Sequence, residues 1–148
     1  MSSTYSSIHL HVVFSTKHRQ PLIAPAWRPR LHAFVGGAIR TLEASPEAIG
    51  GVEDHVHLLI GLKPIHRVSD LVREVKKASS HWIVRETEAK AFAWQEGYAA
   101  FSVSASSQRE VRDYIARQEE HHRKRSFREE LVLFLERSGV TYDERYLD

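Results

Sequence analysis

The chain has 148 residues, of which 42% are hydrophobic and 27% are charged, and these values are typical of one soluble domain with a buried core. No apolar run is long enough to cross a bilayer and no N-terminal signal pattern is present, so we expect no membrane association and a cytoplasmic location. The absence of cysteine excludes disulfides and thiolate metal ligands. The formal charge of +2 is too small to indicate nucleic-acid binding by itself.

The order of predicted elements is β-α-β-β-α-β followed by helices. Strands are predicted from β-forming residues in partial alternation, and helices from apolar residues at helical spacing. Ser126 and Glu129 form a capping-box pattern at the start of the last helix, and Gly139 follows it as a stop. In chain order we expect strand 8–14, helix 27–44, strand 48–52, a strand that carries His55 and His57 and ends at Pro64, helix 69–87 capped by Ser69, a strand within 92–103, and helices 108–122 and 126–137.

This order is that of the split βαβ, or ferredoxin-like, plan. We therefore expect an α+β fold with a central antiparallel sheet, helices on one face and further helices at the C-terminal end. The two strands that are adjacent in sequence, 48–52 and the histidine strand, are expected to be central. No linker or repeat divides the chain, so a single domain over residues 1–148 is expected.

Two histidines one residue apart are the most informative local feature. A strand turns alternate side chains to opposite faces, so His55 and His57 share a face while Val56 points into the core. Two imidazoles on rigid backbone make half of a metal site. The alternative is a pair of structural histidines, one hydrogen-bonded and one exposed.

The helix 108–122 offers a further ligand and a reacting group. Tyr114 and Gln118 are four residues apart and share one helical face. Two imidazoles with an amide oxygen form a mixed nitrogen and oxygen set that suits Mg²⁺ or Mn²⁺, and other divalent metals are open alternatives. Tyrosine is a known covalent nucleophile, although most helix tyrosines simply pack their rings. His121 and His122 lie near the same face, where either can be a ligand, a phosphate contact or part of a solvated helix end.

Two segments resemble a known superfamily. The stretch 54–60, Asp-His-Val-His-Leu-Leu-Ile, resembles the His-hydrophobic-His motif of the HUH endonucleases. The stretch 114–127, from Tyr114 through Gln118 to Phe127, resembles the catalytic helix of their single-tyrosine transposases. These are encoded by small bacterial insertion sequences and by relatives associated with repetitive extragenic palindromes (REPs). The resemblance extends over segments 11–17, 76–82, 94–98 and 142–147.

The resemblance implies a metal-dependent DNA strand transferase. His55, His57 and Gln118 would bind one divalent metal, Mg²⁺ or Mn²⁺, and the helix with Tyr114 would be the catalytic helix. Tyr114 would attack a phosphate in single-stranded DNA and leave a 5′-phosphotyrosine bond and a free 3′-hydroxyl, with no nucleotide cofactor. Relatives are homodimers that recognise hairpins at element ends. The alternatives are a domesticated, non-catalytic hairpin-binding module on the same fold and, more distantly, a nuclease that uses water.

Basic residues outside these motifs are candidates for phosphate contacts. Any one of them alone is most simply part of a solvated face, and together they fit a DNA-binding surface only if the fold brings them to one side. The candidates are Lys17, Arg19, Arg73, Lys76 and Lys77.

Overall fold

A computed structural model describes residues 3–147, and its centre is a four-stranded antiparallel sheet in the order β2-β3-β1-β4. The strands are β1 (Ile8–Ser15), β2 (Ser45–Gly51), β3 (His55–Leu62) and β4 (Ala99–Val103). The predicted α+β, split βαβ fold is confirmed. The predicted centre of the sheet is wrong. Each βαβ crossover skips one position in the sheet, and a strand of the other βαβ unit fills that position. Thus β3 fits between β1 and β2, and β2 lies at an edge.

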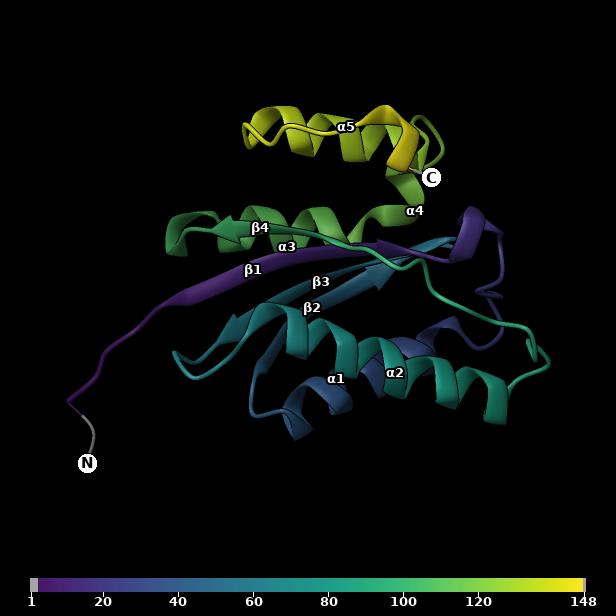
Figure 1. Cartoon of the computed structure of the whole chain (residues 1–148), viewed down its shortest axis with the longest axis horizontal. Coiled ribbons are helices and arrows are strands. Elements are labelled where there is room, and N and C mark those ends of the chain that lie inside the picture. Colours follow the sequence, from purple (N-terminus) through teal and green to yellow (C-terminus); the bar gives the residue numbers. More distant parts are fainter. Residues whose placement is uncertain (1–2, 148) are drawn as a thin grey trace.

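Helices cover both faces of the sheet (Figure 1). On one face lie α1 (Arg28–Thr41) and α2 (Val68–Glu86), the two crossover helices. On the other face lie α3 (Gln108–Ala116), α4 (Gln118–His121) and α5 (Phe127–Arg137). Three single 3₁₀ turns, η1 (Lys17–Arg19), η2 (Ala105–Ser107) and η3 (Glu144–Tyr146), complete the elements. No helix among residues 3–147 is both long and apolar enough to span a membrane.

The main core lies between the sheet and α1 and α2. Alternate residues of the two central strands supply it, including Val12 and Phe14 from β1 and Val56, Leu58 and Ile60 from β3. Because side chains alternate along a strand, the neighbours of these residues point to the opposite face, under α3 and α5. Packing on the first face therefore fixes the register of the residues on the second.

Helix boundaries differ from the predictions in three helices. The helix predicted over 27–44 is shorter, Arg28–Thr41. The helix predicted over 108–122 is interrupted at Arg117, whose φ and ψ are −107° and 28° and whose N–H donates to the Tyr114 carbonyl. The N-cap of α2 is Arg67 and not Ser69, so that prediction is wrong by two residues.

The predicted ends of α5 are confirmed. Ser126 and Glu129 form the capping box at its start. At its other end Gly139 adopts φ +67°, and Val140 N–H donates to the Leu135 carbonyl, as in a Schellman motif. The ends of α5 are therefore encoded locally.

Candidate active site

The first strand-borne histidine is fully buried and fixed on both ring nitrogens. His55 is 0% exposed, and its Nδ1–H donates to Oδ1 of Asp54 at 2.7 Å. Its Nε2 lies 3.2 Å from Oε1 of Gln118. Phe127 packs on the ring, with centroids 4.4 Å apart. A carboxylate on one nitrogen orients the other nitrogen toward the interior of the site, as in histidines that bind metals.

The second histidine has a partner that the sequence did not indicate. His57 is also 0% exposed, and its Nε2–H donates to Oε1 of Glu130 at 2.9 Å. Its Nδ1 lies 2.7 Å from Nε2 of His11 on the neighbouring strand. Burial, followed by the nearby charge of His57, lowers the pKa of His11 to about 3, so His11 is neutral. His11 thus orients His57 as Asp54 orients His55.

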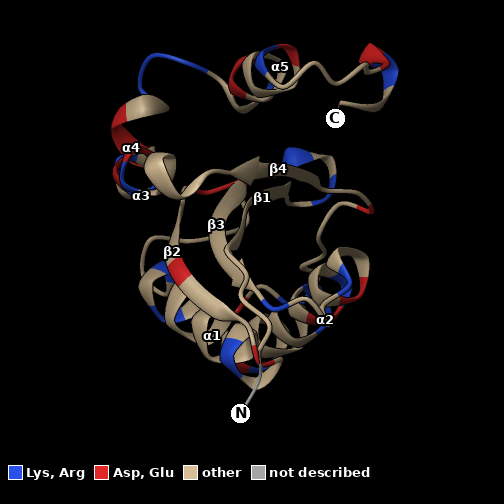
Figure 2. Ribbon diagram, turned by 90° about the vertical axis from the view of Figure 1, so that its left-hand side faces the viewer, with Lys and Arg blue, Asp and Glu red and all other residues tan. Residues whose placement is uncertain are grey.

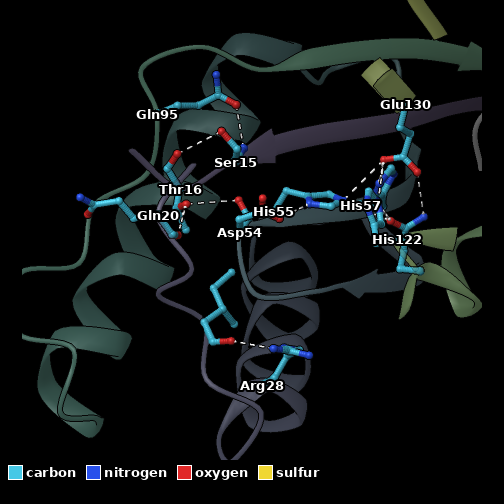
Figure 3. Close-up of polar contacts among 12 residues, drawn as sticks. Ser15, Thr16, Gln20, Arg28, Asp54, His55, His57, Gln95, His122 and Glu130 are labelled. Carbon is cyan, nitrogen blue, oxygen red and sulfur yellow. Dashed lines mark hydrogen bonds and ion pairs between the residues drawn. The ribbon is translucent and has the colours of Figure 1, made fainter. Parts of the chain in front are cut away.

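Glu130 contacts the candidate groups from both strands and helices, and Figure 3 shows it beside His57 and His122. Its side chain comes from α5 and is 2% exposed. Oε1 accepts from His57 and, at 3.3 Å, from Nε2 of His122. Oε2 accepts from the Tyr114 hydroxyl and, at 3.4 Å, from Nε2 of Gln118. The two carboxylate oxygens therefore face different partners, the histidines on one side and the tyrosine on the other.

Four side chains offer metal-ligand atoms within one small volume. His55, His57, His122 and Glu130 each place one such atom within 4.8 Å of the others. The predicted ligand Gln118 adjoins this group, because its Oε1 lies 3.1 Å from Nε2 of His122 as well as near His55. We call these five residues the ligand cluster.

The two adjacent histidines of α4 and its C-cap take different positions. His122 turns its ring into the ligand cluster and packs against His55, with ring centroids 4.4 Å apart. His121 instead stacks on the ring of Tyr114 at 4.3 Å. The sequence left both possibilities open, and in the structure only His122 adjoins the ligand atoms.

The electrostatics of the cluster are those of one buried carboxylate among histidines, of which His55 is held protonated and His57 neutral. Burial lowers the pKa of His55, but hydrogen bonds to Asp54 and Glu130 outweigh it and raise that pKa to about 9. Burial dominates at His57 and lowers its pKa to about 4. Burial acts to raise the pKa of Glu130, but the hydrogen bonds from His122, His55 and His57 hold it far below its usual range. Glu130 is therefore an anion at neutral pH.

Tyr114 sits at the edge of this network. Burial and the hydrogen bond to anionic Glu130 raise the pKa of Tyr114 well above its usual range. Its ring is held by the stacked His121 and by the edge of Phe134, whose centroid is 5.5 Å away. The phenol is thus positioned but neutral, and a cation beside Glu130 is needed to favour its ionisation.

A close approach of α3 to the sheet brings Tyr114 and Gln118 to the histidines. A Cβ added to Gly50 of β2 would lie 2.3 Å from the Ile115 carbonyl oxygen. Ile115 itself is 1% exposed and anchors α3 to the sheet. Only glycine at position 50 permits this packing.

The predicted phosphate contacts fall on two different parts of the molecule. Lys17 and Arg19 lie in η1, directly after the end of β1 that pairs with His55. Arg73, Lys76 and Lys77 lie on α2, across the sheet from Tyr114. Lys76 donates to the carbonyls of Gln95 and Gly97 at 2.6 and 2.9 Å, so it holds a loop of its own chain. The fold therefore does not gather these five residues beside the ligand cluster.

A family model described as IS200-like transposase matches residues 4–118, a segment that contains both strand histidines, Tyr114 and Gln118. The chain belongs to the IS200-like transposase family. It is thus a transposase of the single-tyrosine type that the sequence resembled. The matched segment ends at Gln118, so two members of the ligand cluster, His122 and Glu130, lie beyond it.

Two solved structures share the fold of this transposase. A crystal structure of a Deinococcus radiodurans protein assigned as a transposase is 21% identical, with a TM-score of 0.65 over 80% of this chain and 95% of that one. A REP-associated tyrosine transposase bound to a REP hairpin is 17% identical, with a TM-score of 0.57 over 79% of this chain and 72% of that one. No curated protein sequence matches the chain.

Proposed function

We propose that this transposase is a single catalytic domain that cleaves and rejoins single-stranded DNA through a phosphotyrosine bond at Tyr114, with a divalent metal held by His55, His57 and Gln118. The observation that carries the proposal is the convergence on one buried carboxylate. Tyr114, Gln118 and His57 all hydrogen-bond to Glu130, and His55 lies 3.5 Å from it. A binding module has no need of a nucleophile beside a buried ligand cluster.

The donor set fits a divalent metal. Its atoms are imidazole nitrogens, an amide oxygen and a carboxylate oxygen, a mixed set that can hold several divalent metals, and we propose Mg²⁺ or Mn²⁺ from the family resemblance. We include His122 and Oε1 of Glu130 as further candidate ligands, because their atoms adjoin those of His55 and His57. When bound, the metal would polarise the scissile phosphate and withdraw negative charge from it.

In the proposed reaction the Tyr114 oxygen bonds to phosphorus and the bond between phosphorus and the 3′ oxygen breaks. The phosphate remains on its 5′ oxygen as a diester with tyrosine, and the 3′ oxygen leaves as a hydroxyl after taking up a proton. A second 3′-hydroxyl can reverse the step and join new ends. Oε2 of Glu130 accepts the hydrogen bond of the phenol, so it is the group placed to receive the phenolic proton.

The DNA partner follows from the family. We propose hairpins in single-stranded DNA as the substrate, and support comes from the structural relative that is bound to a REP hairpin. Lys17 and Arg19 are the phosphate contacts we favour, because η1 follows the strand end that pairs with His55. A homodimer stays a prediction from the family resemblance, and light scattering of the purified protein measures it directly.

The test is covalent capture of labelled DNA. The protein is incubated with Mg²⁺ or Mn²⁺ and single-stranded DNA from the flanks of its own gene, and adducts are resolved on denaturing gels. We expect an adduct with the wild-type protein and none with Tyr114→Phe or His57→Ala. Tyr5→Phe, which changes a tyrosine that is 92% exposed, is the matched control and should form the adduct normally.

Two outcomes would contradict the proposal. Cleavage that persists in Tyr114→Phe would indicate a nuclease that uses water. Hairpin binding without cleavage under either metal would indicate the domesticated binding module.

A further inference from the structure

A pocket adjoins the ligand cluster at the β2 edge of the sheet. The pocket lies between the start of α1, the end of β2 and the segment that joins α3 to α4. Figure 2 shows α1 below β2, and α3 and α4 above it. Gln118 lines this pocket and also contacts His55 through Oε1. Whatever occupies the pocket would therefore lie next to the proposed metal site.

Two buried nitrogens in this pocket lack partners within the described chain. Arg28 is only 8% exposed, and one of its terminal nitrogens donates to the Ile23 carbonyl at 2.8 Å. Its Nε, and Nε2 of His32 one helical turn later, have no hydrogen-bond partner among residues 3–147. A buried guanidinium with an unused donor is costly, and protein structures normally satisfy such a group.

Three arginines and two glutamates line the pocket, which gives it a small excess of positive charge. Arg117 and Arg123 line it with Arg28. Burial and the charge of Arg28 lower the pKa of His32 to about 4. The opposing carboxylates are Glu119 and Glu120, of which Glu119 places Oε1 3.5 Å from Arg28 and is 73% exposed. An exposed carboxylate at that distance is weakly held and can be displaced by a stronger anion.

We propose that this pocket binds a backbone phosphate of single-stranded DNA, neighbouring the phosphate that Tyr114 attacks. The inference rests on the proposed function for the identity of the DNA. Guanidinium groups match phosphate oxygens in geometry and charge, and Arg28 brings to the pocket an Nε–H that has no partner among residues 3–147, beside the charges of Arg117 and Arg123. The shared residue Gln118 sets the two phosphates side by side, so that binding in the pocket positions the strand for cleavage.

The first test measures affinity without cleavage. Labelled single-stranded DNA is titrated against Tyr114→Phe protein in EDTA, with and without Arg28→Gln. We expect Arg28→Gln to weaken binding about tenfold and to reduce the salt dependence by roughly one phosphate contact. Arg30→Gln on the same helix removes the same charge outside the pocket and should change affinity far less.

A neutral methylphosphonate is then placed at each position of the DNA in turn. We expect the loss of DNA affinity caused by Arg28→Gln to disappear when the methylphosphonate stands at one particular position. A neutral group there has already lost its ionic contact with Arg28, so the substitution has nothing further to remove. Glu119→Gln, which removes the competing carboxylate, should strengthen binding, whereas Glu110→Gln on α3 should have a smaller effect. The comparison of Glu119→Gln with Glu110→Gln tests the proposal even if the Arg28→Gln protein does not fold.

The proposal is overturned if no methylphosphonate position couples to Arg28 and Glu119→Gln behaves like Glu110→Gln. Because these measurements use a protein that cannot form the adduct, they are independent of the adduct assay. A wild-type protein that fails to form an adduct would refute the proposed function without deciding this binding test.

Discussion

The two faces of the central sheet are built from the same strands and have opposite characters. Toward α1 and α2, strand β3 presents Val56, Leu58 and Ile60 to an apolar core. Toward α3 and α5, the same strand presents His55 and His57 to a buried polar network. The apolar face is stabilised by area removed from water, which is nondirectional. The polar face depends on individual donors and acceptors, each of which needs its partner.

This difference explains how one strand can carry both stability and chemistry. A helix pair on the apolar side fixes the position and register of β3, so the histidines are held in place by residues that they do not contact. Substitutions on the apolar side should therefore change the free energy of unfolding and leave the metal response intact. Substitutions on the polar side should reduce the metal response by more than any loss of stability explains.

The largest effect is expected for Glu130→Gln. The amide keeps the shape of the side chain but removes its negative charge, and an NH2 donor replaces one of the two oxygens that accept from His57 and Tyr114. We expect adduct formation to fall about 100- to 1,000-fold, the range seen when one electrostatic group is removed from an active site. The rise in melting temperature on adding Mn²⁺ should also shrink, as calorimetry can measure.

The matched control is Glu129→Gln on the preceding residue. Glutamine is also accepted at that capping-box position, so α5 should keep its start and the activity should stay near wild type. Full activity in Glu130→Gln would show that the carboxylate is only a structural neighbour of the histidines.

Next in size is Leu58→Ala on the apolar face. Leu58 is 1% exposed and lies between the sheet and the crossover helices. Truncation should lower the free energy of unfolding by about 3 kcal/mol in urea titrations, the usual cost of a buried leucine cavity. The folded fraction should still gain stability from Mn²⁺. Loss of the metal response in Leu58→Ala, with the fold retained, would show that the two faces are not independent.

A smaller effect is expected where the polar face meets the edge of the sheet. In Gly50→Ala the new Cβ collides with the Ile115 carbonyl, and backbone must move to relieve the contact. We expect a loss of about 2 kcal/mol in stability. Because α3 carries Tyr114, adduct formation should fall more than the loss of folded protein explains. Gly37→Ala is the control, since a Cβ there meets no atom within 4 Å.

The fold was largely predictable from the sequence, because its signals are local. The alternation in β1 and β3, the capping box at Ser126 and the stop at Gly139 each act through near neighbours. The order of strands in the sheet, in contrast, depends on which strand fits between the two strands that each crossover helix connects. The expectation that the two consecutive strands are central therefore failed, and β1 and β3 took that place.

The candidate site was predictable only where spacing within one element defines it. His55 and His57 follow from strand alternation. Tyr114 and Gln118 were predicted from helical spacing, and they meet in the structure although the break at Arg117 places them in α3 and α4. His11 and Glu130 reach the same site from other elements, and only the strand order and the path of α5 bring them there. The chain shows one weak signal for Glu130, an acidic residue on the inner face of a helix that is otherwise lined by Phe127, Leu131 and Phe134.

The most gradual effect we predict is the pH dependence of metal affinity. The pKa of His55 is raised to about 9 in the metal-free protein, and its Nε2 must lose a proton before it can bind a metal. Below pH 9 the metal competes with that proton, so the affinity for Mn²⁺ should rise about tenfold per pH unit up to that value. Isothermal titration calorimetry in buffers of different ionisation enthalpy measures both the affinity and the protons released.

Asp54→Asn sharpens this test. Asp54 raises the pKa of His55 through a hydrogen bond and its charge, so the amide should lower that pKa and move the plateau of Mn²⁺ affinity to lower pH. The same change removes the carboxylate that orients the ring, which should cost about 10- to 100-fold in affinity on the plateau. An Asp54→Asn variant with an unshifted pH profile would mean that the proton released on binding belongs to another member of the ligand cluster.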